Sequence, residues 1–221
     1  MTTLLRVDAS IRIDGSVSRA LADSAEAAWR AEHPDGVVVR RDLGRDPLPS
    51  NVWPAVAALS MGLDAGPDAN RADTAEASAL AAELSAELRN ADAVLLAVPL
   101  YNYGISQHVK TWIDLLLLDS DLLSGSSLQG RPAIFTLARG GGYGPGTPRE
   151  GWDHATPYLE RIFGDLLGMT VRQAVAELTL APVTPAMADL IPASKAAQEE
   201  AHLAAKDHGV AVAKELIAAT V

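Results

Sequence analysis

Three serines and a glycine near the N-terminus have the types and spacing of a phosphate-binding loop. Ser10, Gly15, Ser16 and Ser18 lie between a short apolar run and a stretch with helical character. The N-terminus of a helix favours an anion because its backbone N–H groups are free and its dipole is positive there, and serine hydroxyls add further donors. The alternative is that Ser16 or Ser18 merely caps the helix. Both interpretations remain open from this segment alone.

A second segment suits a flat ring. Residues 98–105 read Val-Pro-Leu-Tyr-Asn-Tyr-Gly-Ile and follow an apolar run. Two tyrosines offer flat contacts, and an asparagine can hydrogen-bond the edge of a planar ligand. A proline-initiated loop with partly buried tyrosines is the plainer alternative.

A third segment, residues 138–146, is rich in glycine. Consecutive glycines let a backbone approach a ligand closely, although a flexible surface turn has the same composition. The run does not fit G-x-G-x-x-G in any frame, and the serine segment lacks the Gly-Lys-Ser/Thr ending of a Walker loop. A dinucleotide-binding Rossmann domain and nucleotide triphosphate hydrolysis are therefore not expected.

The elements that must position these segments alternate along the chain. Short apolar runs with polar or helix-breaking ends predict buried parallel strands. The predicted strands are Leu4–Val7, Val37–Arg40, Ala93–Val98, Ala133–Leu137 and Thr170–Ala176. The predicted helices are Ser18–Arg30, Ala72–Arg89, Ile105–Leu118, Pro157–Leu167 and Ser194–Ala219. This alternation predicts an α/β fold, a doubly wound parallel sheet of five strands with helices on both faces.

One domain is expected over residues 1–221, with a long excursion at Asp46–Pro54 and Gly62–Pro67 after the second strand. Ligands of open α/β sheets bind beyond the carboxyl ends of the strands, where the strand order reverses. The three segments all follow predicted strands, so they should meet at that edge. They then describe a phosphate at one side and an aromatic ring at the other, and flavin mononucleotide (FMN) matches that shape.

Composition and charge narrow the possible classes of function further. The chain has 221 residues, a formal net charge of −10 and no cysteine. The acidic balance counts against nucleic-acid binding, and the lack of cysteine excludes disulfides, iron–sulfur clusters and thiol nucleophiles. The N-terminus does not look like a signal peptide, and the longest apolar run, Ala93–Leu100, is too short to span a membrane. A cytoplasmic protein without membrane contact is expected, in which redox chemistry would need a cofactor.

Several motifs together resemble those of a known family. They are Ser10-x5-Ser-x-Ser-Arg, Pro99-Leu-Tyr-Asn-Tyr-Gly-Ile, Lys110-x-Trp-Ile-Asp114, Ala138-Arg-Gly-Gly and Asp153-His-x-x-Pro-Tyr-Leu159. In this order and spacing the sequence is similar to the FMN-dependent NADH-azoreductases, also called NADH:quinone oxidoreductases. The resemblance implies a flavodoxin-like homodimer that binds FMN non-covalently at the dimer interface. It also implies ping-pong hydride transfer from NADH or NADPH to a small aromatic acceptor, a quinone or an azo compound.

The resemblance also assigns site residues. Ser10, Ser16, Val17 and Ser18 would hold the phosphate of FMN. The flavin ring would be lined by Leu100, Tyr101, Asn102, Tyr103, Ala138, Arg139, Gly140 and Gly141. The family more often has Ser or Thr where this chain has Ala138.

Two further residues are candidates for the reaction. Tyr143 and His154 could donate a hydrogen bond to the reduced ring or the substrate, although His154 could equally be a surface or interface residue. No metal site is expected, because the other histidines show no metal-type spacing. We expect His33, His108, His202 and His208 to be exposed. Arg12 and Arg19 are expected to be surface charges, either of which could screen the phosphate.

The chain departs from the family in two places. Between Asp114 and Gly130 the family carries a longer, aromatic-rich loop over the flavin, whereas residues 115–129 here contain no aromatic residue. The family's Ala-Glu-Gly after the fifth strand is Ala176-Glu177-Leu178 here. Two other functions therefore stay open: a retasked flavin reductase acting on a bulky polycyclic intermediate of a biosynthetic pathway, and a flavodoxin-type FMN electron carrier.

Overall fold

The computed structural model describes residues 1–60, 62, 71–124 and 127–220. Its centre is one parallel sheet made of β1 (Thr3–Asp8), β2 (Val37–Asp42), β3 (Ala93–Pro99), β4 (Pro132–Ala138) and β5 (Thr170–Ala176). The strands are ordered β2-β1-β3-β4-β5. The predicted doubly wound sheet is confirmed, with every predicted strand in place to within two residues.

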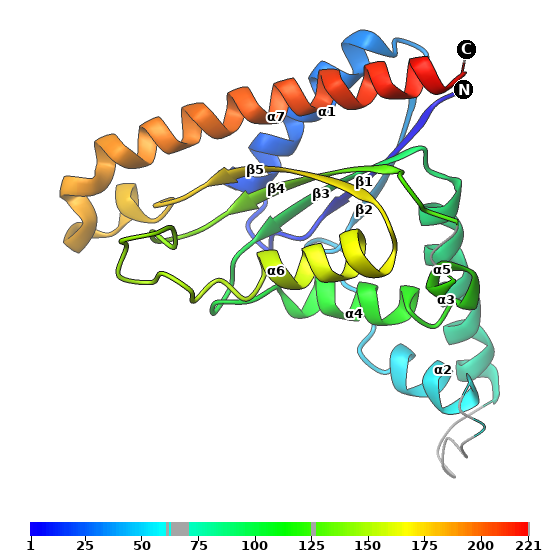
Figure 1. Ribbon diagram of the computed structural model, residues 1–221. Coiled ribbons are helices and arrows are strands. Elements are labelled where there is room, and N and C mark those ends of the chain that lie inside the picture. Colours follow the sequence, from blue (N-terminus) through cyan, green and yellow to red (C-terminus); the bar gives the residue numbers. More distant parts are fainter. Residues whose placement is uncertain (61, 63–70, 125–126, 221) are drawn as a thin grey trace.

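Helices cover both faces of the sheet (Figure 1). On one face α1 (Val17–Glu32) packs along the long C-terminal helix α7 (Ile191–Thr220), and on the other lie α3 (Arg71–Asn90) and α4 (Gln107–Leu116). The residues of β3 show why both faces are filled. Ala93, Leu95 and Ala97 pack toward α1 and α7, whereas Val94, Leu96 and Val98 pack toward α3 and α4. Successive side chains point to opposite faces of the sheet, and both sets are apolar because the strand is buried on both sides.

The predicted loop after the second strand differs in detail from the structure. Helix α2 (Val52–Ser60) begins inside the predicted loop Asp46–Pro54. Pro54 is tolerated there because the first N–H groups of a helix have no partner within the helix. Of the predicted excursion Gly62–Pro67, only Gly62 lies within the described residues.

The predicted helix Pro157–Leu167 changes type along its length. It begins as α6 (Thr156–Leu159) and continues as a π-helix over Glu160–Leu166, where the N–H of Leu167 donates to the carbonyl of Ile162. Short helical turns complete the chain: α5 (Ser120–Leu123) and two 3-10 segments at Ala181–Val183 and Pro185–Leu190. None of the helices in the described ranges is long and apolar enough to cross a membrane.

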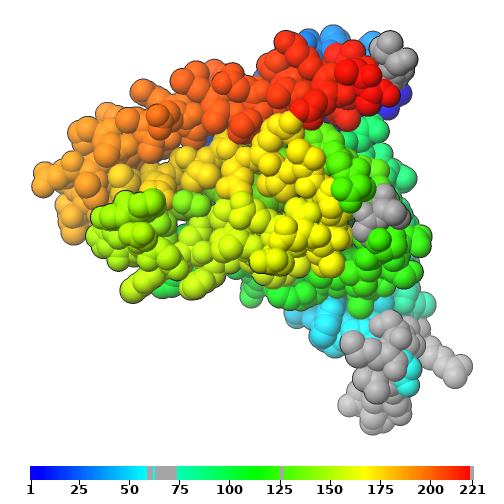
Figure 2. Space-filling view, viewed as in Figure 1, coloured from blue at the N-terminus to red at the C-terminus, as the bar shows by residue number. Residues whose placement is uncertain are grey.

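The carboxyl ends of the strands form one edge of the molecule. In Figure 1 the strand arrows point to the left, whereas α5 and the end of α3 lie at the right. Figure 2 shows the beginning of α7, in orange, projecting past the body at the same left-hand edge, beside the yellow-green loop that follows β4. The loops that follow β1, β3, β4 and β5 therefore meet where the sequence segments above were expected to meet.

Candidate functional site

A cavity of about 800 Å³ lies at this edge, lined by the loops after β1, β3, β4 and β5. It includes nine of the residues assigned from the sequence: Ser10, Ser16, Val17, Ser18, Leu100, Tyr101, Asn102, Ala138 and Gly140. Five further residues line it that were not assigned: Ile11, Arg12, Pro99, Thr179 and Leu180. The crevice lies beyond β1 and β3, the neighbouring strands between which the strand order reverses, as open α/β sheets favour.

The polar end of the cavity is the N-terminus of α1. Ser16 caps this helix, because its hydroxyl accepts a hydrogen bond from the N–H of Arg19 at 3.5 Å. Its hydroxyl also lies 3.4 Å from that of Ser18, and both serines are buried with Ser10. The first N–H groups of a helix have no acceptor within the helix, so this end combines backbone donors, hydroxyls and the positive helix dipole. The capping and anion-binding interpretations are therefore compatible in one residue.

Arg19 lies beneath the loop of residues 10–18, here called the serine loop. This position corrects the expectation that Arg19 is a surface charge. Its guanidinium donates to both carboxylate oxygens of Asp42, at 2.7 and 2.6 Å, and to the carbonyl of Ser10 at 2.8 Å. Hydrogen bonding to Asp42 raises the pKa of Arg19. Gly44 makes room for this contact, since a Cβ there would lie 2.0 Å from the Ser10 carbonyl oxygen. Arg19 thus fixes the backbone of the loop rather than an anion in the cavity.

Arg12 is exposed, as expected of a surface charge, and its side chain also lines the cavity. Its backbone N–H donates to the Ser10 hydroxyl at 3.2 Å, which closes a tight turn at the start of the loop. The positive charge of Arg12 therefore stands close to the donors at the N-terminus of α1.

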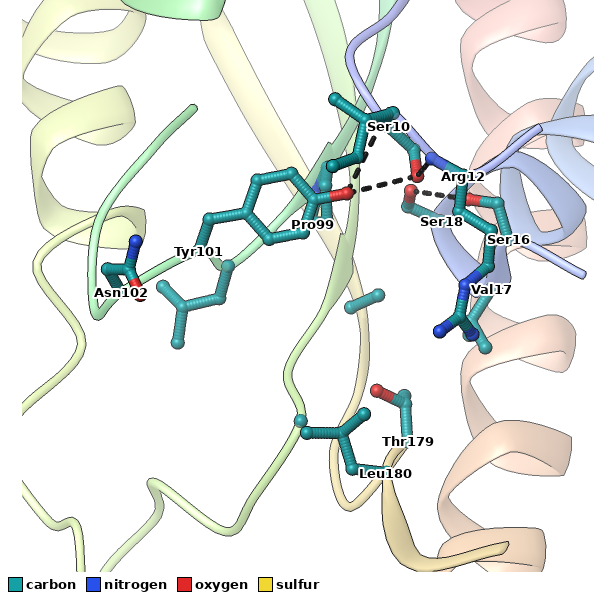
Figure 3. A pocket seen from close by; sticks show the side chains of 14 residues that line it. Ser10, Arg12, Ser16, Val17, Ser18, Pro99, Tyr101, Asn102, Thr179 and Leu180 are labelled. Atoms are coloured by element: carbon teal, nitrogen blue, oxygen red, sulfur yellow. Dashed lines mark hydrogen bonds between the residues drawn. The ribbon is translucent and has the colours of Figure 1, made fainter. Parts of the chain in front are cut away.

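Tyr101 joins the two loops on either side of the strand-order reversal. Its hydroxyl lies 3.4 Å from the Ser10 hydroxyl and accepts from the N–H of Ile11 at 3.3 Å. Tyr101 also pairs with Gly104 across a tight turn in which Asn102 has φ +48° and Tyr103 has φ +68°. In Figure 3 the Tyr101 ring lies between the serines on one side and Asn102 on the other. The cavity therefore has a polar end and an end shaped by the tyrosine turn.

Two backbone hydrogen bonds close the far end of the cavity. The N–H of Leu100 donates to the carbonyl of Ala138 at 2.8 Å, and the N–H of Leu180 donates to that of Gly140 at 3.2 Å. A Cβ on Gly140 would lie 2.7 Å from Cδ1 of Leu180, so glycine allows this close approach. Thr179 and Leu180 could not be found from sequence spacing, since they reach the cavity only because β5 lies beside β4.

Arg139 was assigned to the flavin ring, but its side chain is engaged elsewhere. Its guanidinium pairs with Asp153 at 2.6 Å and Glu177 at 2.9 Å and donates to the Thr156 hydroxyl at 3.0 Å. Glu177 also accepts from the N–H of Tyr143 at 3.1 Å. Arg139 therefore holds the loop after β4 against α6 and the end of β5, and it lies outside the cavity lining, as do Tyr103 and Gly141.

The two candidate reaction residues, Tyr143 and His154, also lie outside the cavity lining. Tyr143 is half-buried, and burial raises its pKa, which favours a protonated hydroxyl able to donate a hydrogen bond. His154 is exposed, and its backbone N–H donates to the carbonyl of Tyr103 at 2.8 Å. His154 therefore lies beside the tyrosine turn, and Tyr143 lies beside the same turn, with its ring centroid 6.4 Å from that of Tyr103.

The remaining histidines correct an expectation, since all four are half-buried rather than exposed. Ring nitrogens of three of them lie within hydrogen-bonding distance of another element: His202 of the Ser24 hydroxyl, His33 of the Ala213 carbonyl and His208 of the Gln173 carbonyl. These contacts join α7 to α1, to the turn after α1 and to β5, so the three histidines have structural roles.

The aromatic-free segment 115–129 was expected near the roof of the active site. In the described part of this segment, Asp119 caps α5 and pairs with Arg89 at the end of α3. Arg131 follows it and donates to the carbonyls of Leu88 and Arg89. These contacts place the described part of the segment at the amino ends of the strands, so that part does not cover the cavity.

Comparison with known proteins decides the family. A sequence-family model described as a flavodoxin-like fold matches residues 2–206. Relatives named "FMN-dependent NADH:quinone oxidoreductase" from Frankia casuarinae and Streptomyces avermitilis are each 39% identical to this chain. The first alignment covers 93% of this chain and 98% of the relative, and the second covers 98% and 97%. The chain belongs to the flavodoxin-like family of these FMN-dependent NADH:quinone oxidoreductases.

Solved structures agree on the fold of this family. An azoreductase from Bacillus anthracis str. Sterne superposes with a TM-score of 0.76 at 23% identity, covering 95% of this chain and 99% of that one. An FMN-dependent NADH-azoreductase from Bacillus anthracis str. Ames Ancestor, in complex with FMN, gives a TM-score of 0.75 at 16% identity. That comparison covers 96% of this chain and all of the other. The flavodoxin-like architecture is thus shared at low sequence identity.

Proposed function

We propose that this protein is an FMN-dependent NADH:quinone oxidoreductase that also reduces azo compounds, by ping-pong hydride transfer. In the quinone reaction NADH gives up a hydride and becomes NAD⁺. The quinone gains two electrons and two protons, one of them from solvent, and becomes a hydroquinone. An azo bond needs two such rounds to yield two amines. Bound FMN supplies the hydride relay between donor and acceptor.

The observation that carries the proposal is the polarity of the cavity. One end presents the N-terminus of α1 with the buried serines, and the other presents the Tyr101 turn and the bare backbone at Gly140. A ligand with a phosphate at one end and a flat ring at the other satisfies both ends. The residues present therefore fit FMN, and the comparisons above support the same cofactor.

The roles of the chain's own residues follow from this fit. Ser10, Ser16 and Ser18 with the first N–H groups of α1 would hold the phosphate, and Arg12 would add positive charge. Tyr101, Asn102, Leu100 and the loop at Gly140 would line the ring. Arg19 and Arg139 would act as positioning residues, because their guanidinium groups fix the two loops and neither residue lines the cavity. Tyr143 and His154 are proposed to donate hydrogen bonds at the site where hydride is transferred.

An absorbance experiment tests the proposal directly. The purified protein is mixed with FMN, freed of excess cofactor, and treated with NADH without oxygen, followed by a quinone. We expect a bound-flavin spectrum that bleaches with NADH and recovers with the quinone. Bound flavin that NADH cannot bleach would favour the electron carrier, and a protein that does not bind FMN would overturn the proposed cofactor site.

We further propose that residues 1–221 act as one cytoplasmic FMN-binding domain and assemble as a homodimer around the flavin. In support, Ile11 and Leu180 line the cavity yet are 62% and 44% exposed, and apolar side chains at a cavity mouth suit contact with a second chain. The FMN-loaded protein should sediment at twice the chain mass of 23.1 kDa. A monomer that retains FMN would contradict the dimer without affecting the proposed reaction.

A further inference from the structure

Three aromatic side chains gather beside the cavity, and the roles assigned above leave two of them without a function. Tyr103 lies edge-on to Trp152, with ring centroids 5.4 Å apart, and edge-on to Tyr143 at 6.4 Å. We name Tyr103, Tyr143 and Trp152 the rim cluster. Trp152 is 51% exposed and Tyr103 is 40% exposed, so the cluster presents aromatic surface to the outside.

The rim cluster is held in place rather than left loose. Tyr103 has φ +68°, a conformation that costs a non-glycine residue free energy and is typically found at functional sites. Its carbonyl accepts from the N–H of His154 at 2.8 Å, and the N–H of Trp152 donates to the carbonyl of Arg149 at 3.1 Å. The ion pair between Arg139 and Asp153 fixes the residue next to Trp152. The backbone that carries these rings is therefore held in place.

The rim cluster continues the cavity at its ring end. Tyr103 directly follows Asn102, which lines the cavity on the side of Tyr101 away from the serines (Figure 3). Tyr143 lies three residues after Gly140, which lines the same cavity. The loops that carry the cluster therefore border the ring end of the cavity.

The chemistry of the rim cluster favours a flat, electron-poor occupant. Aromatic faces are electron-rich, and the exposed rings of Tyr103 and Trp152 offer such surface to a further planar group. The guanidinium carbon of Arg149 lies 6.0 Å from the centroid of Tyr143, over its ring, and its positive charge attracts the carbonyl oxygens of an acceptor. An oxidised quinone has the matching properties, since it is planar and electron-poor.

We propose that the rim cluster is the binding subsite for the electron acceptor and that it selects planar acceptors of two or more fused rings, with Trp152 as the specificity-determining residue. This inference rests on the proposed quinone reduction and names its substrate class. An acceptor with one ring reacts at the ring end without reaching Trp152, whereas a fused second ring extends onto the cluster.

The experiment compares Trp152→Leu with a matched control, Trp53→Leu. Trp53 lies on α2, outside the cavity lining, and is 39% exposed, so both substitutions remove a partly exposed indole. Initial rates are measured with 1,4-naphthoquinone and 1,4-benzoquinone as acceptors. We expect Trp152→Leu to lower kcat/KM for naphthoquinone by about tenfold, the loss of an aromatic contact of about 1.4 kcal/mol, and to leave benzoquinone within about twofold. Trp53→Leu should change neither, and Trp152→Phe should restore most of the naphthoquinone rate.

Two readouts separate this proposal from the proposed function. Bleaching of bound FMN by NADH tests the function alone, and the control Trp53→Leu should leave its rate unchanged. Quenching of tryptophan fluorescence by naphthoquinone tests the subsite without any turnover, and it should weaken in Trp152→Phe. Equal losses for both quinones would overturn the proposal, as would unchanged naphthoquinone kinetics and quenching. A change in sedimentation with Trp152→Leu would also overturn it, because the cluster would then be an interface between copies of the chain.

Discussion

Ser16 caps a helix and is proposed to bind phosphate, two roles that sequence alone could not separate. It caps α1, and its hydroxyl faces the polar end of the cavity. Aspartate caps a helix about as well as serine and interacts favourably with the helix dipole, but its negative charge repels a phosphate. A single substitution can therefore retain the cap and remove the anion site.

We expect Ser16→Asp to leave the thermal stability of the FMN-free protein nearly unchanged and to weaken FMN binding by about 100-fold or more, since like charges in contact cost several kcal/mol. Stability is measured by thermal unfolding and binding by flavin fluorescence titration. Ser106→Asp is the matched control, because Ser106 caps α4 in the same way and lies outside the cavity lining. If Ser16→Asp binds FMN as tightly as the unsubstituted protein, the phosphate is bound elsewhere.

Tyr101 offers a second test at this scale, because its hydroxyl and its ring can be separated. Tyr101→Phe keeps the ring and removes the contacts to Ser10 and Ile11. A neutral hydrogen bond contributes about 1 kcal/mol, so FMN should bind about fivefold more weakly by the same titration. Tyr158→Phe, a half-buried tyrosine outside the cavity lining, is the control. Unchanged affinity in Tyr101→Phe would mean that this hydroxyl does not order the serine loop.

At the scale of elements, the face opposite α3 depends on how closely α1 and α7 approach each other. A Cβ on Gly209 of α7 would lie 2.3 Å from the Ala25 carbonyl oxygen of α1 and 3.1 Å from Cβ of Ala28. The backbones therefore meet at a glycine, and the neighbouring contact of His202 with Ser24 fixes the same pair of helices. The position of α1 matters for function because its N-terminus forms the polar end of the cavity.

We expect Gly209→Ala to lower the free energy of unfolding by roughly 1–3 kcal/mol, because the added methyl group forces the helices apart. Gly164→Ala is the matched control, since its Cβ would find only Cγ2 of Val171 at 3.8 Å. There the higher helix propensity of alanine should leave stability unchanged or raise it by up to about 1 kcal/mol. Urea unfolding measures both variants. Equal effects of the two substitutions would show that helix contact at Gly209 does not limit stability.

At the scale of the whole molecule, buried charges join β1, β2 and α1. The carboxylate of Glu26 on α1 is buried and pairs with Arg6 at 2.9 Å, Arg30 at 2.9 Å and Arg40 at 2.5 Å. Burial alone would raise the pKa of Glu26, but the hydrogen bonds from Arg30 and Arg6, with the charge of Arg40, hold it below its ordinary value. Asp42 behaves in the same way: Arg19 outweighs its burial and lowers its pKa.

A carboxylate with a lowered pKa in the folded state stabilises the fold above its unfolded pKa and loses that contribution as the pH falls through its folded pKa. The melting temperature should therefore be nearly constant from neutral pH down to about pH 5 and fall below about pH 4.5, the ordinary glutamate value. Glu26→Gln should be less stable than the unsubstituted protein at pH 7, and the difference should shrink in acid. Glu76→Gln, at an exposed position of α3, is the control. A difference that stays constant with pH would contradict this role of Glu26.

Much of the molecule is determined by local patterns. The five strands, the α/β alternation and the serine and tyrosine segments follow from the sequence, because hydrophobic periodicity and turn-forming residues act over short distances along the chain. The convergence of these segments also follows, since parallel strands carry their carboxyl ends to one edge. A sequence that alternates strands and helices therefore determined where the cavity would be.

Tertiary structure decided which way the side chains face. Arg139 follows a strand end like its neighbours, yet Asp153 and Glu177 draw its guanidinium away from the cavity. Arg19 lies under the serine loop only because Asp42 ends the adjacent strand. Leu180 reaches the cavity because β5 pairs with β4, and the rim cluster forms because two loops meet. Each of these contacts joins residues far apart in sequence, so it depends on distances through space that no local pattern encodes.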